Sequence, residues 1–111
     1  MALKHAQLLD VIDLHATHEA RGTSVSSSLL KTAHMQLMQL NLPQGHRLPA
    51  HHVPGEITIQ CVAGEVNVVT SQCRRQLGAG QLMALPGGES HEIEASRDAL
   101  LLVTVLRVGR G

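Results

Sequence analysis

The sequence contains no phenylalanine, tyrosine or tryptophan among its 111 residues. Without aromatic rings the chain cannot stack a nucleobase, a flavin or a sugar ring, and it has no phenol to serve as a general acid. Its core must therefore be aliphatic. The hydrophobic fraction of 43% is that of a globular domain and not of a disordered chain. The length is sufficient for one domain.

The chain also lacks net charge, long apolar runs and a set of cysteines. Nine basic and nine acidic residues balance, so no basic field exists to attract nucleic acid or anionic lipid. The longest apolar run, residues 99–103, is far shorter than the roughly 18 residues of a membrane span. Two cysteines, Cys61 and Cys73, make no disulfide framework and favour a reducing compartment. We therefore expect a cytoplasmic protein that binds neither nucleic acid nor membranes.

What the sequence does contain is a series of short apolar runs, separated about every ten residues by Gly, Pro or polar turns. This spacing predicts an all-β antiparallel fold. The expected strands are residues 33–42, 47–51, 57–62, 66–70, 74–77, 81–85, 91–95 and 99–108, with turns at 43–45, 53–55, 63–64, 71–72, 78–80 and 86–88.

The first part of the chain is expected to form a short N-terminal arm, residues 1–30, that packs on a β-barrel of residues 31–111 or is swapped. Residues 3–14 fit either one or two helical turns or an edge strand. Residues 23–28 fit either a polar linker or the beginning of a strand that starts at Val25.

Strand alternation predicts which side chains point inward. In residues 91–95 the two glutamates share one face, so His91 should point inward with Ile93 and Ala95. In residues 57–61 the inward set is Ile57, Ile59 and Cys61. Residues 99–106 are apolar on both faces, which predicts that a second sheet or a partner subunit covers both. We expect a homodimer for this reason.

One segment carries a recognisable spacing: Gly80, five residues, Pro86, one residue, Gly88, two residues and His91. This segment resembles the second sequence motif of the cupin superfamily and matches it through the histidine. The family's usual Asn four positions later is Ala95 in this sequence.

A second segment is similar to the first cupin motif in part. Gly45, five residues, His51 and then Gly64 stand at the family's spacing. The positions of the family's second His and its Glu are Val53 and Ile57, whereas His52 and Glu56 each stand one residue away. The resemblance covers residues 33–106 and implies a small cupin, an antiparallel jelly-roll β-barrel of two sheets.

The resemblance also implies one divalent metal (Fe, Mn, Ni, Cu or Zn), bound by two His, a Glu and a further His. His51 and His91 fill the first and last of these positions. A third ligand would have to come from Glu56 or His52, and a β-bulge at residues 53–55 would be needed to turn either one inward. The alternative is that the protein binds no metal and that His91 closes the barrel mouth, hydrogen-bonded to backbone.

Two functions follow from these alternatives. The first is a small-molecule-binding protein, in which a small organic ligand lies at the barrel mouth against His51, His91, Ile57, Ile59 and Met83. The second is a metal-dependent enzyme of the oxygenase or isomerase type that uses His51, His91 and either Glu56 or His52 as ligands. A barrel filled by its own Leu, Met and Ile side chains would instead be a structural protein.

Overall fold

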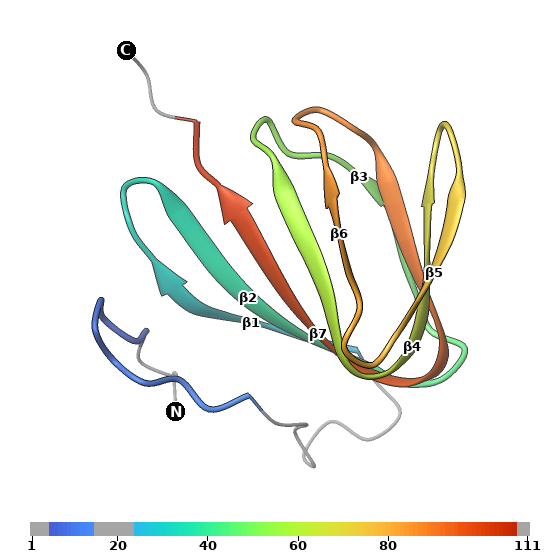
Figure 1. Cartoon of the computed structure of the whole chain (residues 1–111), viewed down its shortest axis with the longest axis horizontal. Helices are drawn as coiled ribbons and strands as arrows, with labels where there is room; N and C mark the ends of the chain where they lie inside the picture. Colours follow the sequence, from blue (N-terminus) through green and yellow to red (C-terminus); the bar gives the residue numbers. More distant parts are fainter. Residues whose placement is uncertain (1–4, 15–23, 109–111) are drawn as a thin grey trace.

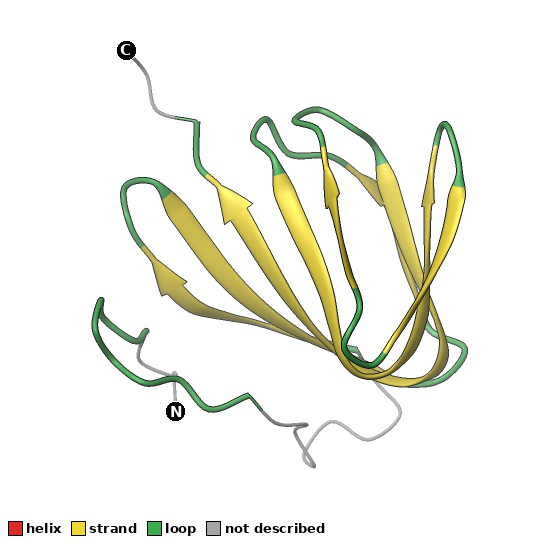
Figure 2. Cartoon of the chain, in the orientation of Figure 1, coloured by secondary structure: helices red, strands yellow, loops and turns green. Residues whose placement is uncertain are grey.

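The computed structural model describes residues 5–14 and 24–108. All regular secondary structure in these ranges is β-strand, which confirms the all-β prediction (Figure 2). The strands are β1 (Val25–Lys31), β2 (Met35–Leu42), β3 (Arg47–His51), β4 (Ile57–Thr70), β5 (Arg74–Gly78), β6 (Leu82–Leu85) and β7 (His91–Leu106).

The strands form one antiparallel sheet in the order β1-β2-β7-β4-β5, with β3 also paired to β7 and β6 also paired to β4. The two longest strands, β4 and β7, pair along their whole lengths. Each has a different outer neighbour at its two ends: β7 pairs with β3 and then β2, and β4 pairs with β6 and then β5. The sheet bends across the middle of β4 and β7, so that its two halves face each other (Figure 1).

The bend replaces a turn that the sequence predicted. Residues 57–62 and 66–70 were expected as separate strands joined by a turn at 63–64, but they form the single strand β4. Likewise, the predicted strands 91–95 and 99–108 are joined in β7. The register of the β4–β7 pair shifts three times between Cys61 and Val66, and Gly64 has a φ of +84°. The chain therefore bends at Gly64 instead of reversing there.

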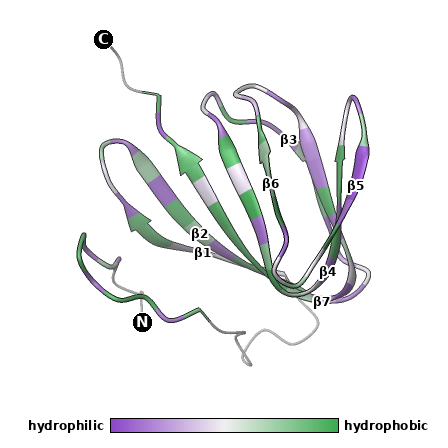
Figure 3. Ribbon diagram, in the orientation of Figure 1, coloured by the Kyte–Doolittle hydropathy of each residue, from purple (hydrophilic) through white to green (hydrophobic). Residues whose placement is uncertain are grey.

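The core lies between the two facing halves and is aliphatic. Ile57, Ile59 and Cys61 of β4 are buried, and His91, Ile93 and Ala95 of β7 are buried too, as alternation predicted. In Figure 3, hydrophobic segments alternate with hydrophilic ones along β2, β4 and β7. The other buried members of the core cluster are Leu40, Leu42, Val66, Val68, Leu77, Leu85, Ala99, Leu101 and Val103.

The outward face of β7 is only partly covered within one chain. Leu100, which points away from its neighbour Leu101, is 6% exposed, whereas Leu102 and Thr104 on the same face are half-buried. The homodimer stays a prediction. None of the described residues forms a helix with the length and hydropathy of a membrane span.

The described part of the N-terminal arm, residues 5–14, contains neither a helix nor a strand. It runs beside β1, where the Ala6 amide donates a hydrogen bond to the Leu29 carbonyl (2.8 Å) and His5 Nε2 lies 2.8 Å from Ser28 Oγ. Of the two alternatives for the following segment, the strand from Val25 is right, so residues 25–30 of the predicted arm belong to the sheet. Residues 1–4, 15–23 and 109–111 lie outside the described residues.

Candidate functional site

An irregularity in β3 brings two histidines together. Leu48 pairs with Ile93 of β7, but the next aligned pair is His51 with His91, so β3 has one residue more than β7 in this interval. Such a bulge changes which side chain faces inward. Without it, Ala50 would stand opposite His91. Pro49 lies within the bulge, where the ladder does not need its missing N–H.

The two imidazoles are cross-strand neighbours, with ring centroids 4.5 Å apart and ring planes tilted by 52°. His51 Nδ1 lies 3.4 Å from the Pro49 carbonyl oxygen, and His91 Nδ1 lies 3.1 Å from the Glu89 carbonyl oxygen. A carbonyl oxygen only accepts, so each Nδ1 carries the hydrogen and donates it. In the neutral form of each ring, Nε2 is therefore an acceptor.

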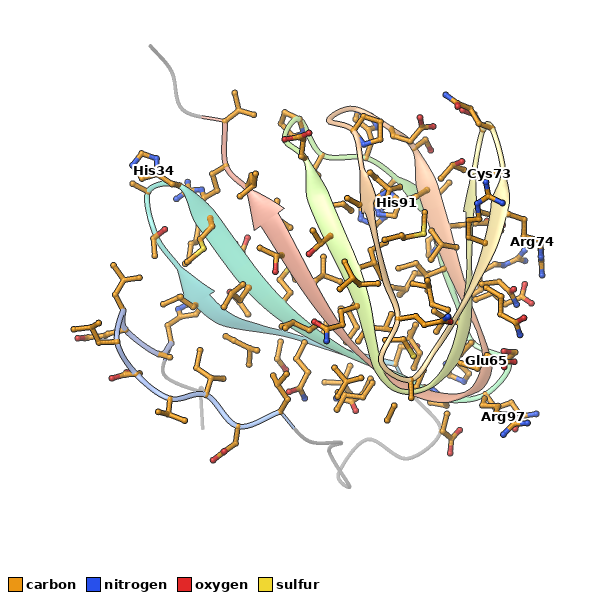
Figure 4. All side chains as sticks on the ribbon, in the orientation of Figure 1. His34, Glu65, Cys73, Arg74, His91 and Arg97 are labelled. Atoms are coloured by element: carbon orange, nitrogen blue, oxygen red, sulfur yellow. The ribbon has the colours of Figure 1, made fainter. Side chains whose placement is uncertain are left out.

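Both rings line a pocket of about 330 Å³ between the two halves of the sheet. Figure 4 shows His91 between these halves. Apart from the imidazoles and Ser26 of β1, the lining residues that the structure describes are all aliphatic or proline: Met38, Leu40, Leu48, Pro49, Ala50, Val53, Ile57, Ile59, Ile93, Val103 and Val105. The pocket thus offers a long apolar wall and one concentrated polar element, the histidine pair.

The architecture around this pocket occurs in many solved structures. A cupin superfamily protein from Desulfitobacterium hafniense superposes with a TM-score of 0.75 over 78% of this chain and 80% of that one, at 15% identity. An RmlC-like cupin from Desulfovibrio desulfuricans gives a TM-score of 0.70 over 95% and 97% of the two chains, at 21% identity. The chain has the cupin fold.

A conserved protein of unknown function from Streptococcus pyogenes is also similar, with a TM-score of 0.79 and 20% identity over 99% of this chain and 100% of that one. No protein-family model matches the sequence, and no curated protein matches it. Structural similarity at these identities establishes the fold, whereas the function must come from the site.

The described side chains of this chain do not fit the four-ligand metal centre that the resemblance implies. Among the described residues, no three His, Cys, Asp or Glu side chains are grouped closely enough to hold a metal ion. His52 and Glu56 are exposed in the loop between β3 and β4, and neither lines the pocket. The bulge of β3 lies before His51 and not at residues 53–55, where one would be needed to turn His52 or Glu56 inward, so it turns His51 toward His91 and leaves His52 and Glu56 outside.

The environment of His91 favours its neutral form. Burial lowers the pKa of His91, and the neighbouring His51 ring acts in the same direction. The hydrogen bond to the Glu89 carbonyl opposes this effect, since the bonded proton is held in place. Desolvation is the largest of these influences, so the pKa of His91 lies below its usual value of 6.5.

This pKa shift predicts how stability depends on pH. An unfolded chain binds a proton at this histidine near pH 6.5, whereas the folded protein binds it only at lower pH. The contribution to stability is therefore complete above pH 6.5 and is lost as the pH falls toward the folded-state pKa. We expect the urea midpoint of the wild type to fall between pH 7.5 and 5, and His91→Leu to remove part of that fall. An NMR titration of His91 with a midpoint at or above 6.5 would contradict this expectation.

The remaining residues predicted for the site are placed differently. Ile57 and Ile59 line the pocket, as expected for a ligand-binding role. Met83 of β6 does not line it: the side chain packs, half-buried, against the core cluster beside Ile59. Cys61 is buried with its thiol 3.3 Å from the Ala63 carbonyl oxygen, and burial raises its pKa, which suits a packed side chain and not a nucleophile.

Most of the pocket wall was not identified from the sequence. Met38 and Leu40 of β2, Leu48 of β3 and the pair Val103 and Val105 of β7 all line the pocket. Alternation along β7 predicts that the inward-facing residues continue from His91 to Val105, so Val103 and Val105 could have been identified from the sequence. Which segments of β2 and β3 face that strand depends on pairing between distant residues, which alternation alone does not give.

Proposed function

We propose that this cupin-domain protein binds a small organic molecule in the pocket between the two halves of its sheet, beside His51 and His91. The observation that supports the proposal most is the pocket, which has a volume of about 330 Å³ and an aliphatic lining with one histidine pair. This volume is within the range of known ligand sites, and an apolar wall with few convergent polar groups is their usual composition.

The metal-dependent enzyme is the weaker alternative. It requires a third ligand next to His51 and His91, and the described residues supply none. Two imidazoles alone hold a divalent ion weakly, because common protein sites for such ions use three or four ligands. Neither Glu56 nor His52 reaches the pair without a rearrangement of the loop between β3 and β4.

Methyl NMR tests the proposal directly. We suggest titrating the protein with octanamide, octanoate and methyl heptanoate, three molecules with the same number of non-hydrogen atoms. Saturable shifts of the Met38, Ile59 and Val103 methyl groups, without shifts of the exposed Leu82 and Leu106, are the expected result. If none of the three compounds shifts the pocket methyls at any attainable concentration, the proposal is wrong.

Elemental analysis of protein purified without a histidine tag separates the two functions. A binding protein of the proposed kind contains no stoichiometric metal. A stoichiometric divalent metal that disappears in His91→Ala would favour the enzyme and overturn the proposal.

A further inference from the structure

The lining of the pocket restricts the charge of a ligand. Among the residues that the structure describes, no Lys, Arg, Asp or Glu lines the pocket. Along the buried aliphatic wall of the pocket, a carboxylate, phosphate or ammonium group would lose its hydration without gaining an opposite charge, which weakens binding strongly. The body of a bound molecule must therefore be uncharged.

The lining also restricts the number of polar groups. A sugar or another polyhydroxylated molecule needs a partner for each buried hydroxyl, because an unpaired one weakens binding by about tenfold or more. Within the described ranges, the pocket offers polar side chains only at Ser26 and at the histidine pair, and the rest of its wall is aliphatic. A mainly aliphatic molecule with one polar end matches this distribution.

The histidine pair fixes the hydrogen-bond character of that polar end. Both Nδ1–H groups are engaged by the Pro49 and Glu89 carbonyls. In neutral rings the group left to each imidazole is Nε2, an acceptor. A partner for this pair must donate hydrogens, and a primary amide has two to offer side by side.

The volume limits the length. At about 30 Å³ per water molecule in the liquid, 330 Å³ corresponds to about eleven water molecules, or to a molecule of about that many non-hydrogen atoms. A single-headed chain of this size fits within the pocket.

Resting on the function proposed above, we infer that the pocket selects an uncharged, mainly aliphatic molecule with one hydrogen-bond-donating head group, a primary amide or an alcohol, bound against His51 and His91. The Nε2 atoms of the pair accept from the head group, and the chain lies along Ile59, Val103 and their aliphatic neighbours.

The same three compounds test this inference through their order of affinity. Octanamide donates hydrogens, methyl heptanoate only accepts them, and octanoate is charged at neutral pH. We expect octanamide to bind at least about fivefold more tightly than methyl heptanoate, the factor typical of one hydrogen bond, and octanoate to bind most weakly. Dissociation constants come from the methyl titrations.

Two variants test whether the histidine pair causes the preference for octanamide. In His51→Ala the difference between octanamide and methyl heptanoate should shrink by several-fold. His51 is exposed, so we expect His51→Ala to retain the fold. His91 is buried, and replacing it by leucine could unfold the protein, so the test does not depend on that variant. His34→Ala is the matched control, because His34 lies in the turn between β1 and β2, away from the pocket (Figure 4). It should leave the preference unchanged.

The outcomes separate the two levels of the proposal. If octanoate or methyl heptanoate binds as tightly as octanamide, or if His51→Ala retains the full preference, this inference fails while small-molecule binding stands. If no compound reaches the pocket, both fail.

Discussion

Replacing Gly64 by alanine is expected to lower the free energy of unfolding by more than about 4 kcal/mol, the range of the most damaging single substitutions. Gly64 has a φ of +84°, which costs an L-residue about 1 to 2 kcal/mol. A Cβ at this position would also lie 1.9 Å from the Asp98 carbonyl oxygen and 2.7 Å from Ala99 Cα. Both atoms belong to the backbone of β7, so β4 and β7 would have to separate where the sheet bends.

Gly80→Ala is the matched control for this prediction. Gly80 has nearly the same φ, +88°, but nothing lies within 4 Å of a Cβ built there. Gly80→Ala should lower the free energy of unfolding only by the cost of a left-handed φ for alanine, about 1 to 2 kcal/mol. Urea unfolding followed by far-ultraviolet circular dichroism suits a chain without tryptophan or tyrosine. Equal losses in the two variants would show that the close approach of β4 and β7 at Gly64 is unimportant.

The bend at Gly64 links the fold to the site. It turns the second part of β4 and the first part of β7, which pair with each other, over the remaining parts of the two strands, so that the histidine pair of one half faces Ile57, Ile59 and Val103 of the other. A flat sheet with the same strand order would leave the pocket walls apart. Gly64 also stands at its expected place in the first cupin motif, although only the structure shows that its role is to bend a strand.

Local patterns predicted much of the fold. The bounds of β3, residues 47–51, are those expected from the sequence, and the inward facing of His91 follows from the two glutamates that flank Ile93. These features depend on alternation over a few residues, which is visible in the sequence. The continuity of β4 was not visible, since glycine in the left-handed region is typical of tight turns as well as of bulges.

The site was harder to predict than the fold. The pairing of His51 with His91 depends on one extra residue in β3, and a strand with a bulge has the same local composition as one without it. A metal centre with His52 or Glu56 as a third ligand would have needed a bulge at residues 53–55. The structure has its bulge before His51 instead. As a result, no third possible metal ligand among the described residues lies beside His51 and His91.

Leu101→Ala is expected to lower the free energy of unfolding by about 3 to 5 kcal/mol, as for other fully buried leucines. Leu101 of β7 is 0% exposed and lies between Leu40 of β2 and Cys61 of β4. The chain contains no Phe, Tyr or Trp side chain that could move into the cavity left behind. A domain with a typical stability of about 5 to 15 kcal/mol would lose a large part of it.

Two further substitutions show whether this loss reflects core packing. Leu82→Ala removes the same atoms from a side chain that is 57% exposed, so it should change stability by no more than about 0.5 kcal/mol. Val103→Ala lies two residues after Leu101 on the same face, but its side chain borders the pocket and already lacks neighbours on one side. Val103→Ala should therefore lower the free energy of unfolding by less than the replacement of a valine that is packed on all sides. It should also enlarge the pocket, because the space left by the side chain opens into the pocket. A cost of Val103→Ala that equals that of Leu101→Ala would mean that the pocket is closed by packed side chains, which would also remove the basis for ligand binding.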